Sequence, residues 1–206
     1  MSVRRDEAAK LLLRSRRAPT QRGTRNVDAD PDLAAVLASQ RDRAAFEALY
    51  RRYVDRVYSY AFYQLGDHHD AEDATERTFL AALRGIRSYR DDGATFRAWL
   101  FRIARNTIAN AHRTRSRRRV EPMTAVEHEP QALDADPAGL AVRAEDARRV
   151  RAALAQLHED RRQVILLRFV DGLSAREAGL VLDRSEGAVR VLLHRALRDL
   201  GERLTP

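Results

Sequence analysis

Residues 172–200 read GLSAREAGLVLDRSEGAVRVLLHRALRDL, and this stretch decides the fold of the C-terminal part of the chain. Ser174 is a favourable N-cap for a short helix, and Ser185 is a favourable N-cap for a longer helix that ends near Leu200. Asp183-Arg184 marks the tight turn between them. Apolar residues of the longer helix recur at helical spacing and are expected to face a core: Val189, Leu193, Ala196 and Leu200. Two helices joined in this way predict a helix-turn-helix, whose second helix fits the major groove of B-DNA.

The opposite face of that second helix carries candidate DNA-binding side chains. We predict contacts to bases or phosphates from Ser185, Glu186, Ala188, Arg190, Val191, His194, Arg195 and Arg198. Arginine suits this role because its guanidinium binds phosphates and guanine edges through two parallel hydrogen bonds. The alternative interpretation of the same residues is an ordinary helical hairpin with a solvated basic face.

The whole chain is basic. Its 206 residues contain 38 Lys and Arg against 30 Asp and Glu, a formal net charge of +8, and Lys10 is the only lysine. A protein with this charge is expected to bind a polyanion. The chain has no cysteine, which excludes disulfides, cysteine zinc sites and thiol nucleophiles. Apolar runs such as Leu11-Leu12-Leu13 are too short for a membrane span or a secretory signal, so we expect a cytoplasmic protein without membrane insertion.

Composition divides the chain into four parts. Residues 1–30 are predicted to be a disordered, arginine-rich N-terminal arm, with a brief helix over 6–15 as the alternative. Residues 31–113 have helical periodicity throughout, and residues 141–204 have it again. Between them, residues 114–140 are predicted to be a flexible acidic linker. No segment alternates with a period of two, so we predict an all-α fold of two small helical bundles without a sheet.

Local signals place the helices of the first bundle. Pro31 suits a first helical turn, Asp42 is a favourable N-cap, and Gly66 is a favourable residue after a helix end. Asp67 or Asp70 can cap the next helix. The residues predicted to face the core of that next helix are Ala71, Ala74, Thr75, Thr78, Phe79, Ala82 and Leu83. In the last helix the apolar stripe contains Phe96, Trp99, Leu100, Ile103 and Ala104, while Phe101 lies off it.

Two sets of motifs resemble one known family. Leu173-Ser174 with Glu177, Ser185-x-Gly187-x-Val189-Arg190 and Leu193-His194-Arg195-Ala196 resemble region 4 of bacterial sigma factors. The first bundle resembles their region 2 through the segments Phe46-Glu47-Ala48-Leu49-Tyr50, Asp70-Ala71-Glu72-Asp73, Thr78-Phe79 and Phe96 to Asn106. Together the motifs extend over nearly all of residues 31–204. The short two-domain form is similar to the extracytoplasmic-function (ECF) group of the sigma-70 family.

The resemblance implies a promoter-specific initiation factor that is not an enzyme and has neither cofactor nor metal. Its partners would be core RNA polymerase (large-subunit coiled coil and flap), promoter DNA and, by analogy, an anti-sigma protein. The second helix of the helix-turn-helix would read the −35 element. Polymerase docking would fall to Asp70, Glu72, Asp73, Glu76, Arg77 and Phe79. A loop at 105–110 and its neighbours would read and melt the −10 element through Phe101, Arg102, Arg105, Asn106, Thr107, Asn110, His112, Arg113 and Arg117.

Elementary physics agrees with the melting role. Opening a duplex costs a few kcal/mol of unstacking energy per base, which capture of the exposed bases offsets. Aromatic side chains beside cations do this, and Phe101 lies next to Arg102. For Phe96 and Trp99, which lie on the apolar stripe, a place in the core is the favoured interpretation.

Several residues depart from the family pattern. Many relatives have Gln-Glu at Glu76-Arg77, Asp at Asn110 and Gly at Asp183, and Gly179 stands inside a helix, where glycine costs about 1 kcal/mol against alanine. These departures put any borrowed promoter sequence in doubt.

Two rival functions stay open. One is a conventional helix-turn-helix regulator with an N-terminal sensor or dimerisation domain, and the other is an adaptor that binds no nucleic acid. A metal site at His68-His69 is disfavoured, because adjacent side chains on a helix point in different directions.

Overall fold

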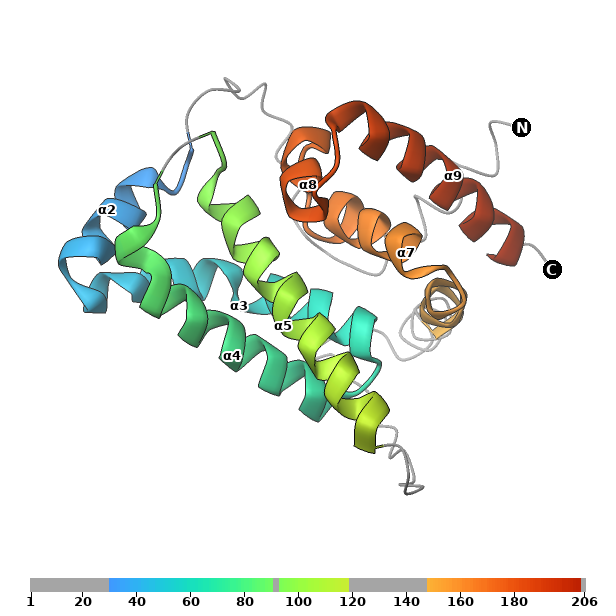
Figure 1. The fold of residues 1–206 in the computed structure, drawn as a ribbon, viewed down its shortest axis with the longest axis horizontal. Helices are drawn as coiled ribbons and strands as arrows, with labels where there is room; N and C mark the ends of the chain where they lie inside the picture. Colours follow the sequence, from blue (N-terminus) through green and yellow to red (C-terminus); the bar gives the residue numbers. More distant parts are fainter. Residues whose placement is uncertain (1–29, 91–92, 119–147, 205–206) are drawn as a thin grey trace, which may run out of the picture.

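The computed structural model describes residues 30–90, 93–118 and 148–204, and for 114–118 the backbone only. The predicted N-terminal arm, except Asp30, and all but the first residues of the predicted linker lie outside these ranges. Within them every regular element is helical, which confirms the all-α prediction. The helices form two groups, one from α2 to α5 and the other from residue 148 to α9 (Figure 1).

The N-terminal bundle consists of α2 (Leu33–Arg41), η1 (Arg43–Ala45), α3 (Phe46–Leu65), α4 (His68–Gly85), η2 (Ile86–Ser88) and α5 (Phe96–Arg118). The predicted caps are present. Asp42 accepts a hydrogen bond from the Ala44 amide at 2.9 Å, and Asp67 accepts one from the Asp70 amide at 2.9 Å. Gly66 ends α3 in the left-handed conformation, with φ +73°. Helix α5 continues to Arg118, so it contains the first five residues of the predicted linker.

Buried aromatic rings hold this bundle together. Phe96 is fully buried and packs against Tyr53, Tyr89 and Trp99, as predicted for the apolar stripe of α5. Two expectations about exposure were wrong. Helical spacing groups Leu37 with Leu33 and Val36 on one apolar face of α2, but Leu37 is 46% exposed. Phe101, placed off the stripe, is fully buried, because three neighbouring helices surround α5 here and a second face of it is covered.

Two aspartates just before α2 attach this segment to the rest of the bundle. Asp30 accepts hydrogen bonds from the Tyr89 hydroxyl at 3.2 Å and from the Phe96 amide at 2.5 Å, and so caps the N-terminus of α5 from a distant part of the chain. Asp32 is fully buried and accepts hydrogen bonds from Arg52 and Tyr53. Burial, together with the Asp32 carboxylate, raises the pKa of the Tyr53 hydroxyl, so it stays protonated and donates.

The C-terminal bundle contains a helix over residues 148–155, α7 (Glu159–Ile165), the π-helical turn η3 (Leu166–Val170), α8 (Ala175–Leu182) and α9 (Glu186–Leu204). Ser174 caps α8 in a complete capping box with Glu177, and the Ser185 hydroxyl accepts from the Ala188 amide at 3.2 Å. Both caps were predicted. The buried face of α9 contains Val189, Ala196 and Leu200, all fully buried, and Leu193 is half-buried.

The turn between α8 and α9 explains two departures from the family pattern. Asp183 adopts the left-handed conformation, with φ +54°, in place of the usual glycine. A Cβ at Gly179 would lie 2.5 Å from the Arg184 carbonyl oxygen, so only glycine lets the turn approach α8 this closely. Gly179 therefore has a packing role that offsets its cost inside a helix.

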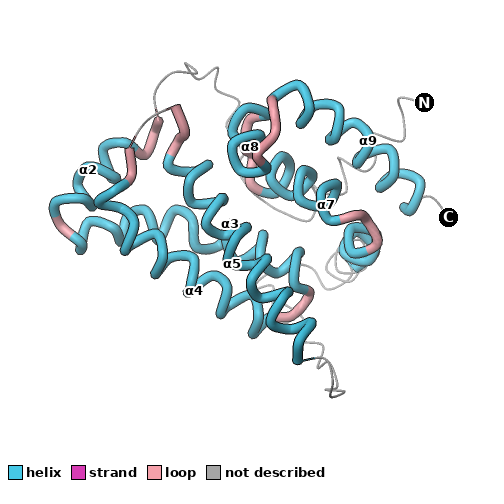
Figure 2. The backbone as a smooth tube through the Cα atoms, in the orientation of Figure 1, coloured by secondary structure: helices cyan, strands magenta, loops and turns pink. Residues whose placement is uncertain are grey.

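The two bundles are in contact. Helix α8 lies against α5, and η3 lies against α3. The two groups of helices lie side by side (Figure 2). Helix α9 packs on α7 and α8, on the side of the C-terminal bundle away from α3, α4 and α5.

Candidate nucleic-acid interface

The outer face of α9 is open to solvent. Seven of its predicted DNA-binding residues, together with the cap Ser185, are exposed: Glu186, Ala188, Arg190, Val191, His194, Arg195 and Arg198. Val191 is 52% exposed although it is apolar, and it lines a shallow depression together with Arg190, His194 and Arg195. Arg190 is paired with Glu186 one helical turn earlier, which orients its guanidinium along the face. This surface combines cations with an exposed apolar side chain, as a major-groove reading helix requires.

Helix α5 replaces the loop that was predicted at residues 105–110. The helix is unbroken from Phe96 to Arg118, because no glycine or proline interrupts the segment. Arg102, Asn106, Asn110 and Arg113 are exposed and recur at i, i+4, i+8 and i+11, so they form one row along its surface. Asn110 accepts a hydrogen bond from Arg113. We call these four residues the outer row of α5.

The remaining predicted −10 residues lie in other surroundings. Phe101 packs edge-on against Tyr60 with ring centroids 5.5 Å apart and is fully buried, so its prediction as a base-capturing aromatic does not fit this structure. Thr107 and His112 are half-buried. Arg117 lies near the end of α5, and its side chain falls outside the described part of the chain.

Arg105 is engaged by the C-terminal bundle. Its Nε donates to the Gln163 side chain at 3.0 Å, and one of its terminal nitrogens lies 3.8 Å from the Asp183 carboxylate. About two turns earlier, Arg97 donates to Glu177 of α8. The sequence pattern alone gave no sign of these partners, because they lie 58 to 80 residues away along the chain.

The predicted docking residues lie along α4. Glu72, Asp73, Glu76 and Arg77 are exposed and Asp70 is half-buried. Arg77 pairs with Asp73 at 3.2 Å, which offsets part of the charge on this face. Phe79 is only 5% exposed, and its ring packs edge-on against Tyr50 of α3 at 4.8 Å, so it supports the surface from below.

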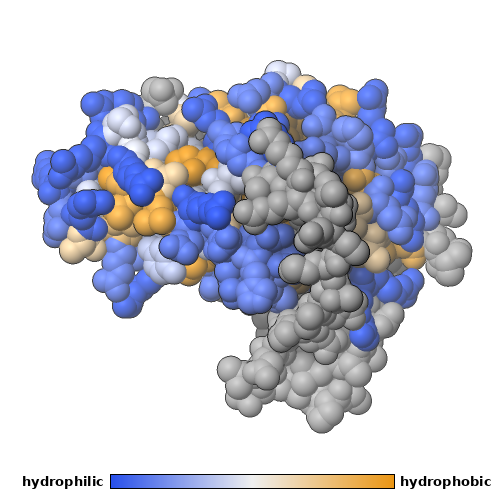
Figure 3. Space-filling model, turned by 60° about the horizontal axis from the view of Figure 1, so that its bottom comes forward, coloured by the Kyte–Doolittle hydropathy of each residue, from blue (hydrophilic) through white to orange (hydrophobic). Residues whose placement is uncertain are grey.

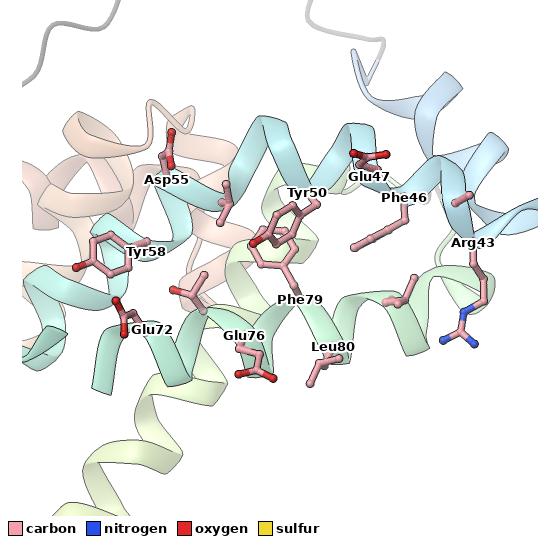
Figure 4. Close-up of a pocket in the computed structure, with 14 residues that line it drawn as sticks. Arg43, Phe46, Glu47, Tyr50, Asp55, Tyr58, Glu72, Glu76, Phe79 and Leu80 are labelled. Carbon is pink, nitrogen blue, oxygen red and sulfur yellow. The ribbon is translucent and has the colours of Figure 1, made fainter. Parts of the chain in front are cut away.

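A groove between α3 and α4 extends this surface. Tyr50 and Phe79 lie between the helices, with the carboxylates of Glu47 and Asp55 on the α3 side and those of Glu72 and Glu76 on the α4 side (Figure 4). Apolar patches among strongly hydrophilic residues are visible on this part of the molecule (Figure 3). The groove thus has an apolar floor and an acidic rim, with Arg43 at one end.

Sequence reasoning missed the α3 side of this groove. Tyr50 of α3 is 43% exposed, although it stands at helical spacing with Phe46 and Tyr53, which are buried. Across the groove, Leu80 of α4 is 42% exposed. A broad apolar stripe cannot show which of its members lies at the edge, because that depends on how closely the facing helix approaches. An acid one turn before such a residue, as Glu47 is to Tyr50, was the available signal.

The histidine pair forms no evident metal site. The His68 ring packs against Phe62 with centroids 4.4 Å apart, and its Nδ1 is hydrogen-bonded to the Tyr58 hydroxyl. His69 is exposed beside Glu72. Among the described residues, no three metal-ligating side chains are grouped to hold an ion, and no helix is long and apolar enough to cross a membrane.

Comparisons with known proteins match both bundles. The family model for Sigma-70 region 2 matches residues 49–118, and the model for Sigma-70, region 4 matches residues 147–200. The ECF RNA polymerase sigma factor BldN of Streptomyces coelicolor is 36% identical over 183 residues, which are 86% of this chain and 69% of that protein. The ECF sigma factor SigE of Mycolicibacterium smegmatis is 33% identical over 178 residues, 85% of this chain and 68% of that protein.

Solved structures have the same fold. CnrH, in complex with the cytosolic domain of CnrY, superimposes with a TM-score of 0.64 at 27% identity, covering 83% of this chain and 95% of that one. The sigma factor RpoE of Bartonella quintana, in complex with the anti-sigma factor NepR, gives a TM-score of 0.62 at 24% identity over 77% of this chain and 96% of that one. The second likeness concerns the fold alone.

Proposed function

The chain belongs to the ECF group of the sigma-70 family of RNA polymerase initiation factors. We propose which of its surfaces bind polymerase and which bind each promoter element. It binds core RNA polymerase and directs it to promoters. We assign region 2 to the N-terminal bundle and region 4 to the C-terminal bundle, with the residues before Asp30 as an arm and a linker that starts after Arg118. A conventional helix-turn-helix regulator is not favoured, because a region 2 match accompanies the region 4 match.

Helix α9 reads the −35 element. Its exposed arginines suit guanine edges and phosphates, and the exposed apolar side chain of Val191 suits a thymine methyl group. The exposure of the whole outer face of α9, with its apolar face buried against α7 and α8, supports this assignment.

The outer row of α5 reads and holds the −10 element. Asn106 and Asn110 carry amides that can pair with the edge of an unstacked base, and Arg102 and Arg113 lie beside them on the same face for the backbone phosphates. Base capture is proposed for these exposed polar side chains and not for Phe101, because Phe101 is buried.

The groove between α3 and α4 binds polymerase. Its acidic rim fits a basic partner, and the exposed faces of Tyr50 and Leu80 add apolar area that a partner helix can bury. The large-subunit coiled coil is the proposed occupant. In this assignment the groove and the acids of α4 form one continuous docking surface.

Two further features follow from the family. We propose an anti-sigma protein as a regulator, because two sigma factors with this fold were solved with such partners or with a partner domain. We also place the chain in the cytoplasm, because core RNA polymerase works there. The protein acts by binding, without a catalytic residue of its own.

The observation that carries the proposal is the pairing of an open helix-turn-helix with a second bundle that presents both a polar helix face and an acid-rimmed groove. Transcription with purified core polymerase on a library of genomic fragments, followed by sequencing of RNA 5′ ends, tests it. We expect discrete start sites preceded by two shared motifs. Unselective starts, from a folded sample that has bound polymerase, would contradict it.

A further inference from the structure

The groove between α3 and α4 is acidic in a chain that is basic overall. Four carboxylates line it, and they belong to Glu47, Asp55, Glu72 and Glu76 (Figure 4). Arg43 is the one cation among its described lining residues, whereas the whole chain has a net charge of +8. A local field of opposite sign to the rest of the protein favours a cationic occupant.

The floor of the same groove leaves apolar surface uncovered. The side chains of Tyr50 and Leu80 are exposed, and those of Val54 and Leu83 are half-buried beside them. The hollow has a volume of about 840 Å³, which lies within the range of pockets that enclose a ligand. An occupant that matches both properties has apolar side chains flanked by cations.

The chain contains such a segment before its first described residue. Residues 10–17 read KLLLRSRR, so three consecutive leucines stand between Lys10 and Arg14, and two further arginines follow. Residues 1–29, which lie outside the described part of the chain, contain eight lysines and arginines against three acids. The leucines match the floor of the groove and the cations match its rim.

The other hollow of note does not suit this segment. The depression on α9 is lined by Arg190, Val191, His194 and Arg195. Its arginines would repel a basic segment, because like charges brought together are unfavourable. Charge therefore directs residues 10–17 to the groove and away from α9.

The attachment point of the segment lies close to the groove. Asp32 accepts hydrogen bonds from Arg52 and Tyr53, which stand within one turn of Tyr50 on α3. Seventeen residues separate Leu13 from Asp30, and a chain of this length spans at most about 55–60 Å, or about 20–25 Å on average when it is flexible. The way round α3, whose diameter with side chains is about 10–12 Å, is well within this reach.

We propose that residues 10–17 occupy the groove between α3 and α4 in the free chain, with Leu11-Leu12-Leu13 on its apolar floor and the flanking cations at its acidic rim. A tether of this kind gives the segment an effective concentration of about 1 mM at the groove. A local dissociation constant of a few hundred micromolar is therefore enough to keep the groove mostly filled.

The contact has a consequence for polymerase, which rests on the proposed function. The coiled coil proposed to bind this groove would have to displace the segment first. A competitor that fills the groove most of the time lowers the apparent affinity of polymerase by about threefold to tenfold. The segment would thus regulate the docking surface from within the same chain.

The full-length chain allows a direct test without polymerase, because it has no native cysteine. A single cysteine at Ala9 carries a nitroxide, and paramagnetic broadening of the amide NMR signals shows which residues it approaches. We expect the signals of the groove residues on α3 and α4 to lose at least half of their intensity relative to those of α9. Reduction of the nitroxide should restore them.

Matched variants separate docking from mere tethering. Changing Leu11, Leu12 and Leu13 together to serine keeps the tether and the charge, and it should restore most of the groove signals. Glu76→Arg, which reverses one charge of the rim, should do so in part. Glu202→Arg makes the same change on the exposed face of α9 and is the control, so it should leave the broadening as it was. Unshifted signals of α5 show that each variant is folded.

Two results would overturn the inference. One is equal broadening of the groove in the unchanged chain and in the triple serine variant, since tethering alone would then explain it. The other is broadening only between molecules, seen when a nitroxide-bearing chain is mixed with an isotope-labelled one, because the occupant would then be a second copy.

A separate measurement distinguishes this inference from the proposed function. The triple serine variant should bind core polymerase about threefold to tenfold more tightly than the unchanged chain. Groove broadening together with unchanged polymerase affinity would support the contact of residues 10–17 and contradict the proposal that polymerase docks in the groove.

Discussion

Arg97 of α5 and Glu177 of α8 belong to different bundles, and they are joined by two hydrogen bonds of 3.2 and 2.6 Å. Glu177 has a second role, because it completes the capping box of α8 with Ser174. One carboxylate therefore both starts the first helix of the helix-turn-helix and attaches that motif to region 2. Glu177 therefore stabilises α8 within region 4 and also joins region 4 to region 2.

The first prediction concerns the reading helix. Arg190→Ala and Arg195→Ala should each lower transcription from promoters that depend on the −35 element. Where the lost guanidinium contacts a base, the binding free energy of the −35 element should weaken by about 1–3 kcal/mol. Promoters with an extended −10 element should be affected less. Run-off transcription on the two promoter types measures the difference. Arg203→Ala, near the end of the same helix, is the control, and equal loss on both promoter types would point to damaged folding or docking instead.

The second prediction separates binding from packing on α5. Asn106→Ala should slow promoter opening, followed by the fluorescence of 2-aminopurine in the −10 element, while leaving the thermal unfolding of the protein nearly unchanged, since the residue is exposed. Phe101→Ala should instead destabilise region 2 by about 3–5 kcal/mol, because it leaves a cavity beside Tyr60. A stable Phe101→Ala protein with a selective opening defect would show that the ring leaves the core to capture a base.

The third prediction tests the groove. Tyr50→Ala and Glu76→Arg should each weaken the affinity for core polymerase, by about 1–2 kcal/mol for the aromatic side chain, in a competition assay against a labelled sigma factor. The loss from Glu76→Arg should shrink as salt rises, whereas that from Tyr50→Ala should persist. Leu37→Ala, an exposed apolar residue on α2 away from the groove, provides the comparison. If both groove variants bound core polymerase as tightly as the unchanged chain, the docking surface would lie outside the groove.

The fourth prediction concerns pH. The pKa of Glu177 in the folded chain lies below its ordinary value of 4.5, so its contribution to the contact between α5 and α8 is complete above about pH 4.5 and is lost as the pH falls through the lower folded-state value. Cysteines introduced at Ala48 of α3 and Glu202 of α9, both exposed, can carry spin labels, and the distance between the labels should lengthen below pH 4.5. Glu177→Gln should lack that step, and an identical acid transition in both proteins would assign it to other groups.

Much of this fold follows from local chemistry. The caps at Asp42, Asp67, Ser174 and Ser185 were predicted because each depends on a side chain and an amide two or three residues away. The exposed face of α9 followed from helical periodicity in the same way. Local signals of this kind also identified the family.

What the sequence could not predict depends on contacts between distant segments. Phe101 was placed off the apolar stripe because a single stripe was expected on α5, whereas the neighbouring helices cover a second face of α5 and bury it. The partners of Arg97 and Arg105 lie in the other bundle. The exposure of Tyr50 depends on how closely α4 approaches α3 beside it. Glycine at position 179 lowers helix stability by local propensity, and its packing role depends on the Arg184 carbonyl, which the turn brings against it.

The central claim is that α9 and α5 touch different stretches of one promoter within the same polymerase complex. Single cysteines at Gly187, where a side chain meets open space, and at Ala109 can carry a tethered iron chelate that cleaves nearby DNA by hydroxyl radicals. The account predicts cuts near −35 from position 187 and near −10 from position 109, on the same template. Cuts at one common location from both positions, or none from position 109 in an open complex, would contradict it.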